Sequence, residues 1–371
     1  MMVKMHSNAS RTRAPGIDIA RALAVIGVVA THTVSGMLNS SLIDSSYPAY
    51  EWIQNIGMLR LPALAFLTGL FIPSGIAKRG ASRYMRIRLV SLGYLYVLWS
   101  LIQGTVAVAF AGYRNGSGGT WLGVLSLWTP EGQLWFLTYL MTASVLLTIF
   151  RPWKNGKRAI ASLVLFLCVT LLMWGRQYNY VGIAGLSLIF FSALGATMGM
   201  HRAVRILNRG LGTWIAVGAV STSLFIALLG ASPQHPASGT SATPPQLLLP
   251  SLLASTVGCI ALVACSQILF FVPYVARPLQ LVGQRTLEVF VMHYSLYAGT
   301  RVLLMHAGVE NPAFHLVAGI SVGVLVPVFL SWLLPRIGMR WLFQPPSFFM
   351  LDGRSLLAKV RLVARRGALR T

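Results

Sequence analysis

The chain has 371 residues, of which 56% are hydrophobic and 10% charged, and its mean hydropathy is +0.69. This composition excludes a soluble globular domain of this length and indicates a polytopic membrane protein. The formal net charge of +23 does not indicate binding of nucleic acid, because no basic patch interleaved with aromatic residues lies outside the expected membrane boundaries.

Apolar runs long enough to cross a bilayer recur along the chain. A helix of about 20 residues spans a hydrocarbon core of roughly 30 Å. We predict an all-α bundle of about ten transmembrane helices in one domain, residues 1–334, followed by a basic cytoplasmic tail, residues 335–371. The predicted spans are 17–37, 57–76, 89–110, 133–150, 159–175, 181–200, 211–231, 250–272, 284–305 and 314–334.

Lysine and arginine residues are distributed unevenly between the two sides of this bundle. With the N-terminus in the cytoplasm, all of them fall on the inner side except Arg21, Arg60, Arg114, Arg176 and Arg301. The positive-inside rule therefore places both termini in the cytoplasm. We expect a multi-pass protein of the cytoplasmic membrane whose basic inner face contacts anionic lipids or an anionic cytoplasmic ligand.

The cysteines and the two ends of the chain add further expectations. Cys168, Cys259 and Cys265 lie within apolar runs, and neither a Cys-x-x-Cys pair nor a metal-ligand spacing of histidines occurs, so we expect no disulfide and no metal site. The first apolar run lacks an Ala-x-Ala cleavage pattern, which favours a retained span over a signal peptide. The aromatic and basic tail fits either a segment along the inner membrane surface or a disordered positive tail.

The first span, GIDIARALAVIGVVATHT at residues 16–33, carries Asp18, Arg21 and His32 in an otherwise apolar run. On a helix, eleven steps of about 100° place Arg21 and His32 on one face, about 16 Å apart along the axis. Ionisable groups in a span cost about 2.5–3.5 kcal/mol each and often mark a site. A purely structural alternative pairs Asp18 with Arg21 and uses His32 as a hydrogen-bonding link between helices.

The residue types at the two positions suit different chemistry. A neutral imidazole at depth is a competent general base, because burial disfavours its charged form. An arginine at the inner mouth of a bundle suits a phosphate. The first span alone leaves the structural and the functional interpretations open.

Five stretches, in order along the chain, resemble membrane acyltransferase family 3, the integral membrane O-acyltransferases. Each motif is weak alone, but five in sequence cover most of the chain and form a specific signal. They are GIDIARALAVIGVVATH in the first span, RLPALAFLTGLFIP in the second, KRGASRYMRIRL before the third, LWFLTYL in the fourth and GQRTLEVFVMH in a late span.

The resemblance implies transfer of an acyl group, commonly acetyl from acetyl-CoA as co-substrate, to a hydroxyl of a cell-envelope carbohydrate or glycolipid at the outer side. No tightly bound cofactor is implied. The separation of about 16 Å between Arg21 and His32 is comparable to the reach of an extended pantetheine arm. Arg21 would then steer the donor and His32 would deprotonate the acceptor, with a covalent acyl-histidine relay as an alternative.

Three arginines before the third span, Arg83, Arg86 and Arg88, could bind the nucleotide phosphates of the donor, and Arg86 and Arg88 are the preferred pair. Their alternative role is to be ordinary positive-inside residues. Arg60 lies near the outer side of the second span, next to a proline-bearing turn, where it could orient His32 or stabilise an oxyanion. Its alternative is to snorkel to outer headgroups.

The late span holds three further polar residues. Glu288 follows Arg285 by three positions, which predicts a local ion pair, but it also lies at the depth of Arg21 and could hold that guanidinium in place. Asp18 is expected to support Arg21 in the same way. His293 is about 140° around the helix from Glu288, so we expect a packing or hydrogen-bonding role rather than a second base.

Two other classes of function compete with acyl transfer. A secondary transporter of a small molecule or lipid would also carry buried charge in ten spans, but neither an inverted repeat nor a carboxylate in a broken helix is evident. A non-enzymatic assembly protein would not need a deep histidine on the face of Arg21. At the outer entrance of the fourth span, Glu131 could touch the acceptor, and Trp135 could do so or anchor the interface.

Overall fold

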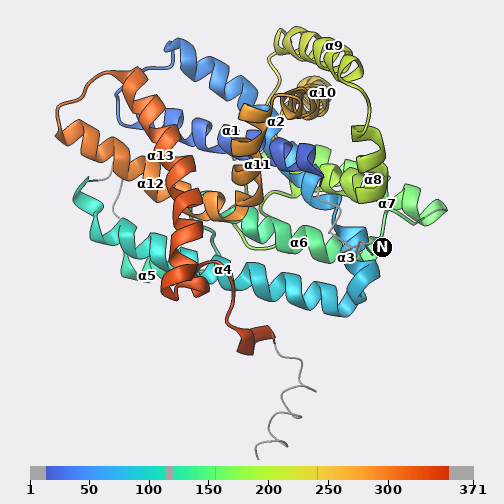
Figure 1. The fold of residues 1–371 in the computed structure, drawn as a ribbon, viewed down its shortest axis with the longest axis horizontal. Helices are drawn as coiled ribbons and strands as arrows, with labels where there is room; N and C mark the ends of the chain where they lie inside the picture. The colour runs from blue at the N-terminus through green and yellow to red at the C-terminus, as the bar shows by residue number, and fades with distance from the viewer. Residues whose placement is uncertain (1–13, 114–119, 155, 240, 351–371) are drawn as a thin grey trace, which may run out of the picture.

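The computed structural model describes residues 14–113, 120–154, 156–239 and 241–350 (Figure 1). Within these residues the chain is almost entirely helical, and a short parallel pair of strands, β1 (Gly175–Arg176) and β2 (Ala237–Gly239), joins two loops. The helices are α1 (Pro15–Asn39), α2 (Pro48–Gly69), α3 (Ile72–Arg79), α4 (Ala81–Ala109), α5 (Trp121–Val124), α6 (Trp135–Phe150), α7 (Lys157–Leu172), α8 (Ile189–Leu207), α9 (Leu211–Leu229), α10 (Pro245–Phe270), α11 (Pro273–Gln284), α12 (Thr286–His306) and α13 (Pro312–Leu333).

Short 3₁₀ turns complete the described secondary structure. They precede or follow the long helices and carry the chain into and out of them. These turns are η1 (Ala111–Tyr113), η2 (Gly132–Leu134), η3 (Leu186–Leu188), η4 (Leu334–Ile337), η5 (Arg340–Leu342) and η6 (Ser347–Met350).

Seven helical stretches in the described residues are long and apolar enough to cross a membrane, which confirms an all-α integral membrane protein. They are Pro15–Asn39, Pro48–Arg79, Ala81–Ala109, Gly132–Phe150, Leu211–Leu229, Pro245–Phe270 and Pro312–Ile337.

Three of the ten predicted spans coincide with helices outside this set. Helix α7 has only 16 residues, and α8 is interrupted at Gly199, whose φ of 65° is not helical. Helix α12 carries Glu288, His293 and Arg301 along its length. The total of ten spans and the orientation of the termini therefore stay predictions.

One predicted boundary is wrong. The span expected at 181–200 begins as a helix only at Ile189, because Gly182 and Gly185 adopt positive φ and turn the chain before it. Helix α2 runs through Pro62 without a break, so the proline next to Arg60 does not open the helix. In a membrane bundle, neighbouring helices help to satisfy the backbone groups that a proline leaves free.

Helix α1 packs against α2, α10, α11, α12 and α13, which places it among helices from both halves of the sequence. Its buried face is made of small and β-branched residues such as Ala20, Ala24 and Val28, so neighbouring helices approach closely. Helix α11, which falls in a segment predicted as an inner connection, lies along α1. Its Gly283 leaves no room for a side chain against the backbone of Asp18.

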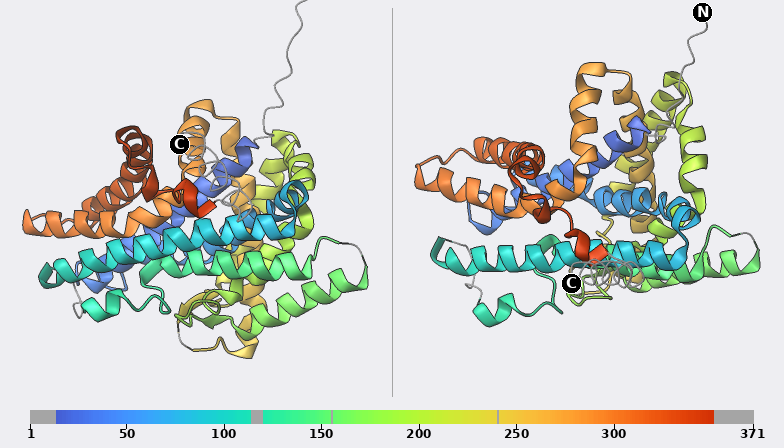
Figure 2. Two further views of the ribbon diagram at one scale, coloured as in Figure 1. Left: turned by 90° about the horizontal axis from the view of Figure 1, so that it is seen from below. Right: turned by 60° about the horizontal axis from the view of Figure 1, so that its bottom comes forward.

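Helices α4 and α6 lie side by side in Figure 1 and in both views of Figure 2. After α13 the chain folds back onto α4, where Tyr94 Oη donates to the Trp341 carbonyl at 2.9 Å and Trp99 Nε1 donates to the Leu342 carbonyl at 3.0 Å. The first part of the predicted tail thus packs on the bundle. The basic run at 351–371 lies outside the described residues.

Candidate active site

The helical geometry assumed for the first span is present in α1, which is continuous from Pro15 to Asn39. Arg21 and His32 are therefore separated by about three turns, or about 16 Å, on one side of the helix. Arg21 lies in the N-terminal third of α1, and His32 lies two turns before its C-terminal end. These two positions organise two separate groups of polar side chains.

His32 faces an aromatic cluster on α12. Its ring centroid is 5.4 Å from that of His293, 6.3 Å from Tyr294 and 6.5 Å from Tyr297, with the Tyr297 ring stacked at 16°. His32 is only partly buried, and neither of its ring nitrogens makes a hydrogen bond to a described residue. A ring held by packing but with unused nitrogens suits a group that exchanges a proton with a substrate.

His293 is fully buried and its orientation is fixed by the backbone of its own helix. Its Nδ1 atom lies 2.8 Å from the Phe290 carbonyl and 3.2 Å from the Val289 carbonyl. Because carbonyl oxygens only accept hydrogen bonds, Nδ1 carries the proton and Nε2 is left with a lone pair. Nε2 is buried without a partner among the described residues.

The expected hydrogen-bonding role of His293 is confirmed, but its position beside His32 was not predicted. The only sequence signal for it is the end of the motif GQRTLEVFVMH, where the histidine closes the resemblance to the acyltransferases. The angular position of His293 on α12 could not reveal its contact with His32, because His32 lies on α1.

Arg60 connects α2 to the helical turn that carries His32. Its Nη1 donates to Thr31 Oγ1 at 2.9 Å, and the Thr31 hydroxyl donates to the Gly27 carbonyl at 2.9 Å. Its Nε is buried and has no partner among the described residues. Arg60 thus points into the bundle and holds Thr31, the residue next to His32, rather than reaching outward to headgroups.

The charge of Arg60 also acts on His235, in the loop between α9 and α10. Burial, with a smaller contribution from Arg60, lowers the pKa of His235 from 6.5 to about 4, so this histidine is neutral at pH 7. The same guanidinium acts electrostatically on His32 and His293. The sequence assigned no role to His235, because the loop around it reads as polar and flexible.

The second group of side chains surrounds Arg21 in the N-terminal third of α1. Asp18, Arg88 and Glu288 all interact electrostatically with its guanidinium. Asp18 also accepts a hydrogen bond from Gln284 Nε2 on α11 at 3.5 Å. The structure therefore brings together four predicted site residues from α1, α4 and α12.

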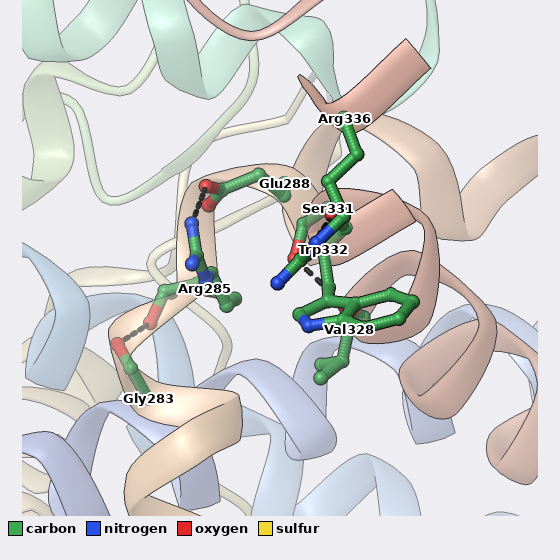
Figure 3. Close-up of polar contacts among 8 residues, drawn as sticks. Gly283, Arg285, Glu288, Val328, Ser331, Trp332 and Arg336 are labelled. Carbon is green, nitrogen blue, oxygen red and sulfur yellow. Dashed lines mark hydrogen bonds and ion pairs between the residues drawn. The ribbon is translucent and has the colours of Figure 1, made fainter. Parts of the chain in front are cut away.

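The local ion pair predicted for Glu288 is present, since Arg285 Nη1 lies 3.3 Å from Glu288 Oε1. Figure 3 draws this pair, and the same carboxylate also acts electrostatically on Arg21. Beside the pair in Figure 3, Arg336 of η4 lies with its guanidinium carbon 3.8 Å from the centroid of the Trp332 ring and donates to the Trp332 carbonyl at 2.5 Å.

The three candidate phosphate-binding arginines of α4 differ in their surroundings. Arg88 is partly buried, interacts with Arg21 and Tyr84, and keeps its Nε buried without a partner among the described residues. Arg86 is partly buried and Arg83 is exposed, and they lie two and five residues nearer the start of the helix. Arg88 is thus the one that the fold brings to Arg21.

Within the described residues no cluster of three or more His, Cys, Asp or Glu side chains is arranged to hold a metal ion. The cysteines Cys168, Cys259 and Cys265 are not in disulfides. The side chains around His32 carry imidazole, phenol and guanidinium groups.

Comparison with known proteins adds the family. A family model described as an acyltransferase domain matches residues 15–332, which run from the first turn of α1 nearly to the end of α13. The match includes all the predicted site residues and agrees with the resemblance found in the five motifs. No curated protein matches the chain.

Proposed function

The chain belongs to the acyltransferase family, and we propose that it transfers an acyl group from a cytoplasmic acyl-CoA to a hydroxyl of an acceptor at the outer side of the cell membrane. The acyl group is acetyl in the simplest case, and the acceptor is a cell-envelope carbohydrate or glycolipid. The observation that carries the proposal is the division of α1 into a charged group around Arg21 and a histidine with unused ring nitrogens about 16 Å away.

In the proposed reaction, the acceptor oxygen attacks the thioester carbonyl carbon while a ring nitrogen of His32 takes the hydroxyl proton. The carbon–sulfur bond then breaks, the CoA thiolate leaves, and the imidazolium returns the proton to the thiolate. The products are an ester and free CoA. General base catalysis of this kind contributes about 10²–10⁴-fold to a rate.

The negative oxygen that develops on the thioester carbon needs a positive or hydrogen-bond-donating partner. Arg60 is bonded to the residue next to His32 and retains a buried, unpartnered Nε. We assign it the stabilisation of this oxyanion together with the positioning of Thr31. A guanidinium held inside the bundle acts strongly because the surrounding dielectric is low.

At the other end of α1, Arg21 and Arg88 would receive the donor phosphates, and the exposed Arg83 and partly buried Arg86 would contact the nucleotide farther out. Asp18 and Glu288 keep Arg21 compensated in the absence of the donor. The pantetheine arm would then run along α1 toward His32. This arrangement delivers a thioester made on one side of the membrane to an acceptor on the other.

A side-resolved assay tests the proposal. The protein is reconstituted in vesicles of one orientation, acetyl-labelled acetyl-CoA is supplied on the cytoplasmic side only, and labelled ester is measured on the other side. Wild type is expected to form the ester, whereas His32→Ala and Arg21→Ala are expected to lose it. The matched control is His201→Ala, which changes an exposed histidine of α8.

Normal insertion and thermal stability of each variant must accompany the assay. Full transfer by stable His32→Ala and Arg21→Ala proteins would contradict the mechanism. Labelled His32 trapped by rapid quenching would instead support the covalent acyl-histidine form of the same reaction.

A further inference from the structure

A large cavity opens between α4, η2 and α12, apart from the charged side chains around Arg21. Its volume is about 590 Å³. Along α12 it extends from Tyr294 to His306, a length of about 18 Å at 1.5 Å per residue. On α4 it is lined by residues of one helix face, from Gln103 to Phe110. A space of this size holds more than a single sugar ring.

This cavity approaches the candidate catalytic histidine through Tyr294, and His32 itself is not among the residues that line it. Tyr294 lines its inner end, and the same ring meets His32 edge-on with 6.3 Å between centroids. Glu131 and Gly132, at the start of η2, also line the cavity, and a Cβ at Gly132 would lie 3.9 Å from the Tyr294 ring, although more than 150 residues of sequence separate the two segments. A molecule lying in the cavity would therefore present one end to the Tyr294 ring, which packs against His32.

The inner end of the cavity is polar. The hydroxyls of Tyr294 and Ser295 make no hydrogen bond to a described residue. Behind them, Gln103 Nε2 donates to the Val291 carbonyl at 2.6 Å, and Gln103 Oε1 accepts from Gln133 Nε2 at 3.0 Å. These amide bonds hold α4, η2 and α12 together around two unused hydroxyl groups.

The rest of the wall is apolar and faces outward. Val106 on α4 is 40% exposed, Phe110 directly after α4 is 55% exposed, and Leu303 on α12 is 73% exposed. Gly299 has no atom within 4 Å of the position that a Cβ would take, so the cavity continues over it. A free sugar would leave hydroxyls unpaired against this wall, and each buried unpaired hydroxyl costs binding free energy.

We propose that this cavity binds the acceptor and that the acceptor is a glycolipid, with its sugar at Tyr294 and Ser295 and its hydrocarbon chain against Val106 and Leu303. The inference rests on the proposed function and narrows its acceptor from carbohydrates in general to lipid-linked ones. Glu131, which lines the cavity next to Gly132, would accept a hydrogen bond from a second hydroxyl of the head.

Matched pairs of methyl and octyl glycosides of glucose, galactose and mannose test the assignment, with the protein in nanodiscs and labelled acetyl-CoA as donor. For the sugar that is acylated, kcat/KM is expected to be at least about tenfold higher for the octyl glycoside, because its chain leaves water for an apolar wall. Equal use of the methyl and octyl forms would overturn the inference and leave the proposed function standing.

Gly299→Leu fills the cavity without a clash at Cβ and is expected to remove most of the octyl preference. The control is Gly212→Leu, at a glycine of α9 that also has open space around it and does not line the cavity. It should keep the wild-type preference. An unchanged preference in stable Gly299→Leu protein would overturn the inference.

A binding readout separates this inference from the proposed function. An octyl glucoside with a diazirine at its chain end is expected to label peptides of α4 and α12, in wild type and His32→Ala but not in Gly299→Leu. Labelling with no acylation of any glycoside would support the cavity and count against acyl transfer. Acylation without labelling of α4 or α12 would count against the cavity alone.

Discussion

The two ends of α1 handle polar groups inside the membrane in opposite ways. Around Arg21, acidic side chains from α1 and α12 compensate the guanidinium, with Arg88 as a second cation. Around His32, the groups are rings and the Arg60 guanidinium without compensating carboxylates, and hydrogen-bonding atoms on His32 and His293 are left unused. One helix therefore supports a site with paired charges and a histidine site without acidic groups, about 16 Å apart.

The two ends of α1 differ because a charged guanidinium and a neutral imidazole need different partners inside a membrane bundle. A cation in a low-dielectric bundle is stabilised by opposite charge or by a ligand that supplies it. A neutral imidazole needs no counter-charge, but its lone pair keeps an unmet capacity for a hydrogen bond. In the proposed function, the first end would exchange its acidic partners for an anionic donor, and the second would accept a proton.

The largest effect is expected for replacement of His32. His32→Gln keeps a polar side chain but cannot act as a base, so kcat should fall about 10²–10⁴-fold. KM for acyl-CoA should stay within a few fold, because the donor phosphates are bound elsewhere. Initial rates over a range of acyl-CoA concentrations measure both constants, and a change confined to KM would contradict the division of roles.

Replacement of Arg21 should mainly raise KM for acyl-CoA, whereas replacement of His32 should mainly lower kcat. Arg21→Gln removes a charged donor to phosphate, and a hydrogen bond to a charged group is worth about 1.5–3 kcal/mol, or about 10–150-fold in KM for acyl-CoA. Arg83→Gln, at an exposed position of α4, should change KM only a few fold. If the two substitutions raised KM for acyl-CoA equally, Arg21 inside the bundle and Arg83 on the surface would not differ in donor binding, which would contradict the prediction.

An intermediate effect is expected at the bond between α2 and α1. Arg60→Gln and Thr31→Val each break the 2.9 Å contact, and together they should lose less than the sum of the single losses, with a coupling of about 0.5–3 kcal/mol. Arg60→Gln should also lower kcat by more than Thr31→Val, because it alone removes the charge near the oxyanion. Additive losses in a double-mutant cycle on thermal stability would show that the contact carries little energy.

The smallest effect concerns pH and His235. Its pKa in the folded protein, about 4, is below the ordinary value of 6.5, so the unfolded chain takes up the proton first as pH falls. Stability from this group is therefore fully present above pH 6.5 and is lost as pH falls toward 4. The apparent Tm of wild type should drop more than that of His235→Gln between pH 7 and pH 4.5, and parallel curves would contradict this.

Local periodicity predicted the features that depend on a single helix. The apolar run around residues 16–33 predicted α1, and the eleven-residue spacing predicted that Arg21 and His32 share one side of it. The spacing of Arg285 and Glu288 predicted their ion pair in the same way. The five motifs predicted the family, which the match to residues 15–332 confirms.

Features that depend on contacts between helices could not be read from the sequence. The neighbours of His32 on α12, the bond from Arg60 to Thr31 and the position of α11 along α1 join segments that are far apart in the chain. Gly182 shows the same limit for helix boundaries, because its positive φ turns the chain before α8, inside the span predicted at 181–200.

The sequence by itself determined a helical membrane protein, its family and the line of polar residues along α1. Only the tertiary structure decided that His32 meets an aromatic cluster, that Arg88 rather than Arg83 reaches Arg21, and that a cavity leads to Tyr294. The physical reason is that helical periodicity acts over three or four residues, whereas the packing of side chains from separate helices sets which of their faces meet.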